Sequence, residues 1–421
     1  MDLVIKNGRV VDPARKIDAV TDVVIRNGKI ASIGKAGVPD IPQLDATGLI
    51  VAPGFFDIHV HLREPGTEEA ETIASGGAAA VAGGFVAVAA MPNTKPSNDN
   101  PSITSYIISE AKRSSPALVF PIGAVTREQK GETLAEIGEM VEAGIVGISD
   151  DGKPVMDGRL FRRALEYAQL FNLPVIQHCE DLNLSKGGVM HEGVYSTRLG
   201  LKGIPSSAED TMVSRDLILA ETTGGRYHVA HLSTRRAVEM VRQAKSQGLN
   251  ITAEVTPHHF TLTDAAVAEY DTNAKMNPPL RSQEDVDALR RGITDGTIDV
   301  IASDHAPHHI NLKMLEFDRA PFGITGLETA VGLAFTELQL PIGRLIEMLA
   351  INPQKIMRVT PWGLFEGSDA HITLLDPGRN WKFDVGQSRS KSRNSPFHGR
   401  MMTGKAVGTI VYGKLVYEDR A

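Results

Sequence analysis

Short apolar runs that end in a histidine or an aspartate recur along the middle of the chain. Runs of this length, bounded by turn residues, are typical of buried strands. In the first of them, residues 49–61, we expect the apolar positions 49–52 to form a strand with His59 and His61 at its C-terminal end. Alternate residues of a strand point the same way, so these two histidines would converge on one point. Four further runs have the same character: residues 146–151, 173–178, 227–231 and 298–305.

Between these runs the pattern changes to a helical one. Residues 68–82, 161–170 and 234–247 have helical composition, and residues 85–91 form another expected strand. Alternation of strands and helices predicts a parallel sheet. Ligands from strands far apart in sequence must meet at one point, which favours a closed barrel over an open sheet. We therefore predict an α/β fold, a (β/α)8 TIM-type barrel over residues 53–362, with its site at the C-terminal ends of the strands.

The two ends of the chain look all-β. Asn7-Gly8 and Asn27-Gly28 lie between β-branched runs, and Asn-Gly in that position indicates a hairpin turn. Residues 370–376 and 408–417 carry the same strand pattern. We predict that residues 1–52 and 363–421 pair into one small β-sandwich built from both termini.

Composition excludes several classes of protein. Of the 421 residues 42% are hydrophobic and 23% charged, which is ordinary for a soluble globular protein. The net charge of −7 leaves no basic face, so neither nucleic acid nor an anionic membrane is an expected partner. The apolar stretch within residues 1–8 is too short for a signal peptide, and no apolar stretch reaches the ~20 residues of a membrane span. The single cysteine, Cys179, cannot form an internal disulfide, which favours a reducing, cytoplasmic location.

The residues at the strand ends are metal ligands by type. Four histidines and two aspartates exceed what one tetrahedral Zn²⁺ needs, so a two-metal site fits better. Asp150 and Asp151 are neighbours, and the spacing alone leaves either as the bridge between the ions. The predicted ligands are His59, His61 and Asp304 for one ion, His178 and His231 for the other, and Asp151 for both.

Such a centre predicts hydrolysis of amide-like C–N bonds. A hydroxide held between two metals is nucleophilic at neutral pH, because metal binding lowers the pKa of water. We expect this hydroxide to attack a carbonyl carbon, with Asp304 as the general base that passes the proton to the leaving nitrogen.

Other polar residues in the same loops are candidates for substrate binding. Arg63 follows the histidine pair and has a guanidinium suited to a carboxylate. With it we group Asn93, Asn277, His308 and the glycine-rich loop 321–326, which together suggest a small, anionic, amide-bearing substrate. Five nearby polar residues are expected to play lesser parts. His258 and His259 would support the site without binding metal, His228 would lie in the core or behind the ligands, and Glu180 and Asp181 would be solvated loop acids.

The order of these motifs resembles the amidohydrolase superfamily over essentially the whole chain and, within it, the bacterial class I dihydroorotases. The motifs lie at residues 53–66, 91–94, 149–152, 256–259, 275–281, 303–308 and 322–323. The resemblance implies reversible interconversion of (S)-dihydroorotate and N-carbamoyl-L-aspartate in pyrimidine (UMP) synthesis. It also implies two zinc ions per subunit, held by the six ligands above with Asp151 as the bridge. The substrate contacts that it implies are His61, Arg63, Asn93, Asn277 and His308, with Phe322 and Gly323 through their backbones.

Two further comparisons sharpen this expectation. Hydantoinases and allantoinases carry a carboxylated lysine as the bridge, whereas here that segment holds Asp150 and Asp151, which favours a dihydroorotase. After His308, however, the sequence of residues 309–313 departs from the family pattern. Some family members are non-catalytic subunits that scaffold aspartate carbamoyltransferase, but the complete ligand set favours catalysis. Candidate protein partners are a second copy of the chain and aspartate carbamoyltransferase.

Overall fold

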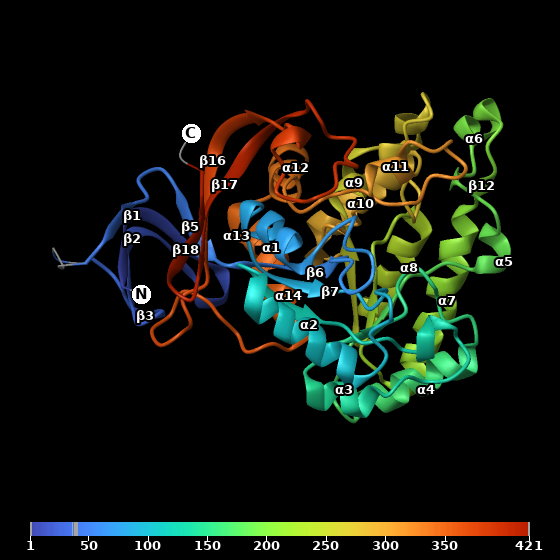
Figure 1. Cartoon of the computed structure of the whole chain (residues 1–421), viewed down its shortest axis with the longest axis horizontal. Helices are drawn as coiled ribbons and strands as arrows, with labels where there is room; N and C mark the ends of the chain where they lie inside the picture. The colour runs from blue at the N-terminus through green and yellow to red at the C-terminus, as the bar shows by residue number, and fades with distance from the viewer. Residues whose placement is uncertain (1, 36, 38–40, 420–421) are drawn as a thin grey trace.

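The computed structural model describes residues 2–35, 37 and 41–419, and Met1 and Ala421, the outer ends of the two predicted terminal segments, lie outside it. The molecule has two lobes, a β-rich lobe that holds both chain ends and a larger lobe in which helices surround strands (Figure 1). This is the predicted α/β architecture, a TIM-type barrel with a β-sandwich.

The barrel consists of eight parallel strands arranged in a ring. Three of them hydrogen-bond as one sheet and five as another, and an isolated bridge between Gly123 and Ile148 joins the two sheets. The ring closes where Val60 pairs with His305 and the amide of His61 donates to the carbonyl of His305 at 2.8 Å. The strands are β6 Phe55–Val60, β7 Phe85–Ala90, β8 Leu118–Pro121, β9 Ile148–Ser149, β10 Val175–Gln177, β13 Tyr227–Val229, β14 Ile251–Val255 and β15 Val300–Ile301.

Helices follow each barrel strand and cover the ring. The main ones are α1 Ile73–Ala82, α2 Pro101–Ser114, α3 Ile137–Ala143, α4 Gly158–Gln169, α7 Ser206–Thr223, α8 Arg235–Ser246, α10 Gln283–Asp295, α12 Ala330–Leu338, α13 Ile342–Ile346, η5 Glu347–Ile351 and α14 Asn352–Met357. Shorter elements lie in the loops at the carboxyl ends of the strands: α5 Leu182–Ser185, β11 Met190–His191, α6 Val194–Leu199, β12 Gly203–Ile204, α9 Pro257–Thr261 and α11 Ile310–Lys313.

The expected helix over 68–82 is too long. The helix α1 begins only at Ile73, because Thr72 is extended and its side chain accepts a hydrogen bond from the amide of Ser75. This capping box fixes the first turn at that point. Composition alone did not reveal the cap.

The terminal strands form a separate sheet in the β-rich lobe. Its order is β18-β17-β16-β5-β1-β2-β3, with β4 paired to β1, so the C-terminal strands join the N-terminal strands in one hydrogen-bonded path where β16 pairs with β5. Their inward side chains, among them Ile5, Ile25, Ile372 and Ile410, share one buried cluster. The strands are β1 Leu3–Asp12, β2 Ile17–Arg26, β3 Lys29–Ile33, β4 Gln43–Asp45, β5 Ile50–Pro53, β16 Ile372–Lys382, β17 Met401–Val411 and β18 Lys414–Glu418.

Two sequence expectations at this sheet are wrong. Asn27-Gly28 is the predicted hairpin turn, but Asn7-Gly8 is not a turn: β1 runs through it with a register shift between Ile5 and Gly8. A Cβ at Gly8 would lie 2.5 Å from Val51, so glycine is needed there for close packing of β5. The apolar run 49–52 likewise belongs to β5 in this sheet, and His59 lies on the separate strand β6.

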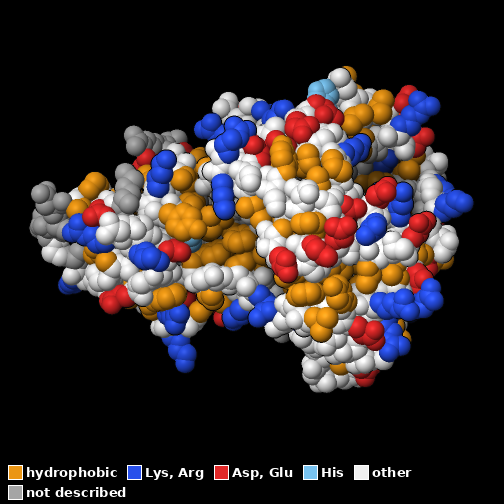
Figure 2. Space-filling model, turned by 60° about the horizontal axis from the view of Figure 1, so that its bottom comes forward, with side chains coloured by type: hydrophobic (Ala, Val, Ile, Leu, Met, Phe, Trp, Pro, Cys, Tyr) orange, Lys and Arg blue, Asp and Glu red, His pale blue; other side chains and the backbone are white. Residues whose placement is uncertain are grey.

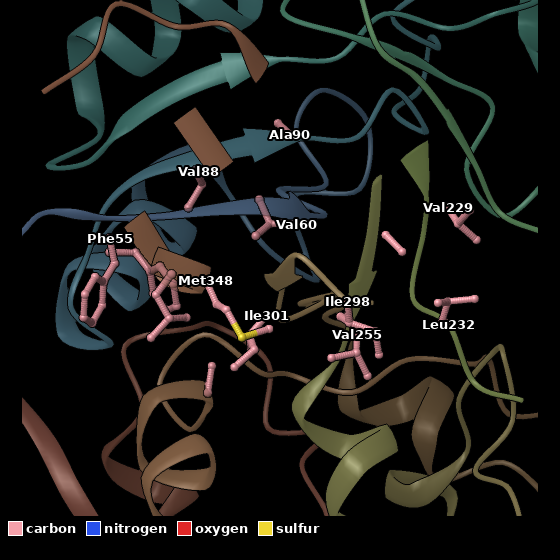
Figure 3. Close-up of a cluster of buried hydrophobic side chains, with 14 of the residues drawn as sticks. Phe55, Val60, Val88, Ala90, Val229, Leu232, Val255, Ile298, Ile301 and Met348 are labelled. Carbon is pink, nitrogen blue, oxygen red and sulfur yellow. The ribbon is translucent and has the colours of Figure 1, made fainter. Parts of the chain in front are cut away.

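The barrel strands pack against the surrounding elements through apolar side chains. Val60, Val88, Val255, Ile301 and Met348 are almost completely buried and come from strands around the ring and from η5 (Figure 3). Protein interiors packed in this way are rigid. The strand ends above this core therefore hold fixed positions.

Charged side chains of both signs lie on the surface (Figure 2). On the face shown in Figure 2, basic and acidic side chains are interspersed, so that face has no continuous field of one sign. No helix in the described part of the chain is both long and apolar enough to cross a membrane.

Candidate metal centre

All six residues predicted as ligands come together at the carboxyl ends of the barrel strands. His59 and His61 come from β6 and the residue after it, and the others follow β9, β10, β13 and β15. Their ligand atoms form three overlapping groups, each with all atoms within 4.8 Å of one another: His59, His61 and Asp151; His59, His231 and Asp304; Asp151, His178 and His231. Every one of the six is buried.

Asp151 lies at the centre of this cluster. Its Oδ1 is 3.3 Å from His59 Nε2 and 3.6 Å from His231 Nε2, and its Oδ2 is 3.5 Å from His61 Nε2. Asp150 faces away, where its Oδ1 accepts hydrogen bonds from the amides of Val125 and Thr126 at 2.8 and 3.1 Å. The tertiary structure thus separates two neighbouring acids that the sequence left as alternatives.

Three of the histidines have their outer ring nitrogens bonded to oxygen acceptors. His59 Nδ1 lies 2.5 Å from Glu254 Oε1, and His61 Nδ1 lies 2.8 Å from Asn93 Oδ1. His178 Nε2 lies 2.8 Å from Glu180 Oε2. A histidine that donates from one nitrogen presents a lone pair on the other, which is how metal-ligating histidines are oriented.

Two of the inner histidine nitrogens lack an oxygen acceptor within hydrogen-bond geometry. His59 Nε2 is buried without a hydrogen bond, and His178 Nδ1 faces His231 Nε2 at 2.9 Å. Burial opposes ionisation of Asp151, yet His59 beside it holds the pKa of that carboxyl well below its usual range. Lone pairs and carboxylates that converge without enough protons to share fit one or more cations, so this donor set suits a metal.

The backbone at the site lies in an uncommon conformation. Arg63, His231 and Asp304 have positive φ angles of 62°, 29° and 44°. Residues in this region cost about 1–3 kcal/mol each and persist where the surrounding structure fixes them. At His231 the amide is held by Glu254 Oε1 at 3.2 Å.

A cavity of about 210 Å³ opens over the cluster. Arg63 lines it, and Arg63 Nε donates to the carbonyl of Pro307 at 3.0 Å. His308 Nε2 lies 2.7 Å from the carbonyl of Phe322, so the ring donates there. The cavity brings together most of the predicted site residues: His61, Arg63, Asn93, Asp151, His178, His231, Asn277, Asp304, His308 and Phe322.

Gly323, unlike most of the other candidate substrate-binding residues, is not among the residues that line this cavity. Its amide donates to the carbonyl of Lys275 at 2.9 Å, and its own carbonyl accepts from Lys313 Nζ and Asn394 Nδ2. Both backbone groups therefore already have partners in the protein. A substrate contact through Gly323 stays a prediction.

Sequence reasoning misjudged one acid. Glu180 is not a solvated loop acid: it is buried and accepts from His178 and from Asn277 Nδ2, the latter at 2.7 Å. Asp181 is half-buried, and its side chain caps α5.

Sequence reasoning also missed an acid altogether. Glu254, on β14, is fully buried and contacts His59, His228 and the amide of His231. Its signal was an acid inside the otherwise apolar or β-branched strand 251–255. His228 lies in the core behind the ligands, as expected, and His259 bonds to Thr256 and Pro278.

A TIM-type barrel with a β-sandwich and buried histidines and aspartates at its strand ends defines a metal-dependent amidohydrolase. Residues 48–237 match the family model described as Dihydro-orotase-like, and residues 1–55 match that of the Urease alpha-subunit, N-terminal domain.

Full-length relatives that share more than half of their residues with this chain indicate the family within this class. The dihydroorotase of Solibacter usitatus is 55% identical over 100% of this chain and 99% of its own length. That of Pelotomaculum thermopropionicum is 53% identical over 100% and 99%. The solved L-hydantoinase of Arthrobacter aurescens shares the fold with a TM-score of 0.89 at 26% identity, covering 99% of this chain and 96% of that one. The chain belongs to the dihydroorotase family.

Proposed function

We propose that this enzyme interconverts (S)-dihydroorotate and N-carbamoyl-L-aspartate in pyrimidine synthesis, using two zinc ions per subunit. The observation that carries the proposal is a complete cluster of six metal-ligand side chains, five of which line one 210 Å³ cavity together with the cationic Arg63. Full-length relatives named dihydroorotase support it.

The ligand set supports two metal positions. His59, His61 and Asp304 would hold one ion, His178 and His231 the other, and Asp151, which lies between both groups, would contact each. Zn²⁺ prefers histidine nitrogen and carboxylate oxygen in this kind of site. When bound, the metal supplies Lewis acidity that polarises the amide carbonyl and acidifies water.

Arg63 would orient the substrate through its carboxylate. Burial lowers the pKa of this guanidinium to about 10, which still leaves it charged at neutral pH. Asn93 and Asn277 line the same cavity and would hydrogen-bond the ring amide groups. Burial and the nearby Arg63 lower the pKa of His308 to about 3, so His308 would act there as a neutral hydrogen-bonding group.

Asp304 would carry the proton. Burial opposes its ionisation, but the adjacent histidines His59 and His61 hold the pKa of this carboxyl below its ordinary value. It is therefore ionised and able to accept a proton at Oδ1, 3.0 Å from His61 Nε2. In hydrolysis that proton passes from the attacking water to the leaving ring nitrogen, and in ring closure it moves the opposite way.

The first experiment measures hydrolysis of dihydroorotate by zinc-loaded protein through ultraviolet absorbance, with hydantoin and allantoin as parallel substrates. Turnover on dihydroorotate alone supports the proposal. Turnover only on hydantoin or allantoin refutes the substrate assignment while keeping the reaction class. Silence on all three with two zinc ions bound refutes independent catalysis and points to a subunit that needs aspartate carbamoyltransferase or another partner.

A further inference from the structure

A segment from the C-terminal part of the chain, residues 388–395, crosses to the mouth of the barrel. The buried acid Glu71 and the half-buried acid Glu328 fix it there. Glu328 accepts from the hydroxyl of Ser388 and from the amide of Arg389, the latter at 2.8 Å. Glu71 accepts from the hydroxyl of Ser390 and from the amide of Lys391, the latter at 3.1 Å. The segment is therefore a fixed part of the barrel rim.

Asn394, near the end of this segment, uses its whole side-chain amide on the rim loops. Its Nδ2 donates to the carbonyls of Ala306 and Gly323, both at 2.9 Å. Its Oδ1 accepts from the amide of His308 at 3.1 Å, and its backbone carbonyl accepts from the amide of Thr325 at 2.9 Å. Only 2% of the residue is exposed, so water does not compete for these bonds.

The two loops that Asn394 joins are those that carry His308 and Phe322. They also touch directly, because His308 Nε2 donates to the carbonyl of Phe322 at 2.7 Å. A Cβ at Gly323 would lie 2.7 Å from His308 Cδ2, so the loops pack at closest approach. A small shift of either loop would therefore move the His308 ring, which lines the cavity over the metal centre.

We propose that Asn394 is a positioning residue that locks the His308 loop to the Gly323 loop and thereby sets the substrate side of the cavity. The proposal rests on the proposed function for its substrate. It gives the C-terminal part of the chain a supporting role behind the substrate pocket, which Asn394 itself does not line.

The test compares Asn394→Asp with the wild-type enzyme loaded with zinc. Aspartate keeps the acceptor for the amide of His308 but turns a donor into a second oxygen that faces two carbonyls. We expect the KM for dihydroorotate to rise about tenfold or more, with a much smaller change in kcat, because one buried hydrogen-bonding group is left facing acceptors. Zinc content is expected to stay at the wild-type value.

Hydrogen exchange gives a readout that does not depend on turnover. We expect peptides over residues 306–311 and 321–326 to exchange faster in Asn394→Asp, while peptides over the barrel strands do not change. Asn394→Ser, which is neutral and small, is the second variant and serves if Asn394→Asp does not fold. We expect the same pattern of exchange in it. The matched control is Asn352→Asp, since Asn352 Nδ2 donates to the carbonyl of Asp299 at 3.0 Å, just before β15 and thus at the opposite end of the barrel.

An unchanged KM together with unchanged loop exchange in either folded Asn394 variant overturns the proposal. So does an equal rise of KM in Asn352→Asp, which would make the effect a general loss of stability. Absence of dihydroorotate turnover in the wild-type enzyme refutes the proposed function instead, and the exchange rates of the two loops then decide the role of Asn394.

Discussion

Replacing Glu254 by glutamine probes the acid that sequence reasoning missed. Glu254 is completely buried, and its two oxygens serve His59 Nδ1 at 2.5 Å, His228 Nε2 at 3.1 Å and the amide of His231 at 3.2 Å. Burial opposes its ionisation, but His59 and His228 hold the pKa of Glu254 far below its ordinary value, so a full negative charge faces His59. That charge makes the inner nitrogen of His59 a better metal ligand.

Glutamine has nearly the same shape and keeps an oxygen for His59 and for the His231 amide, so Glu254→Gln chiefly removes the charge. Loss of such a partner lowers metal affinity about 10- to 100-fold, which corresponds to about 1.4–2.7 kcal/mol. By contrast, Glu254→Ala would strand three buried hydrogen-bonding groups at about 1–3 kcal/mol each and should destabilise the fold.

The assay is titration of metal-free protein with Zn²⁺ against a chromophoric chelator, followed by turnover at saturating zinc. Asp216→Asn is the matched control, since Asp216 is also a fully buried acid but bonds to Arg215, Gln177 and Tyr227 and to none of the six ligands. Wild-type zinc affinity in a folded Glu254→Gln protein would refute the reasoning, as would an equal loss in the control.

Three other substitutions test different parts of the site. Asp304→Asn should retain zinc but lose about 10²- to 10⁴-fold in kcat, because the proton carrier is gone, as measured by steady-state kinetics beside metal analysis. Gly323→Ala should raise KM and lower the melting temperature, since its Cβ would lie 2.5 Å from the carbonyl oxygen of Ala306 at a φ of 152°. In the control variant Gly131→Ala, φ is 71° but no atom lies within 4 Å of the new Cβ, so this variant shows the cost of the backbone conformation without a steric clash. Lys313→Met should flatten the dependence of unfolding free energy on pH between about 7 and 10, measured by urea denaturation.

The sign of the Lys313 effect follows from its proton balance. Burial, with Lys275 nearby, lowers the pKa of Lys313 to about 7 from 10.5, so between these values the unfolded chain binds more protons than the folded one. Stability then rises with pH across this window in the wild-type protein. An identical slope in Lys313→Met, near-normal turnover in Asp304→Asn, or equal effects of the two alanine substitutions would each contradict the corresponding prediction.

The sequence by itself determined the chemistry and the general architecture. Alternating apolar runs and helical segments predict a parallel barrel, because each pattern is local and has a fixed period. The same runs end in His61, Asp151, His178, His231 and Asp304, and ends of parallel strands must lie at one face of a barrel. These residues could be identified without coordinates because the local sequence determines both the direction of each strand and the type of each side chain.

Tertiary structure decided which of several equivalent side chains face the centre. Asp150 and Asp151 differ only in the direction in which the chain turns after β9, and that direction depends on the amides of Val125 and Thr126, which lie in the loop after β8. Glu254 acts on His59, a ligand 195 residues away in sequence, and no local pattern marks a separation of that length.

Another long-range feature is the contribution of Asn394 to the rim. Its bonds to His308 and Gly323 span 86 and 71 residues, and Glu71 and Glu328 anchor the segment 388–395 that carries Asn394 against the barrel. A local pattern constrains which residues share a strand or a helix face. Contacts between distant segments depend on how the whole chain packs, and for that reason only the folded molecule reveals them.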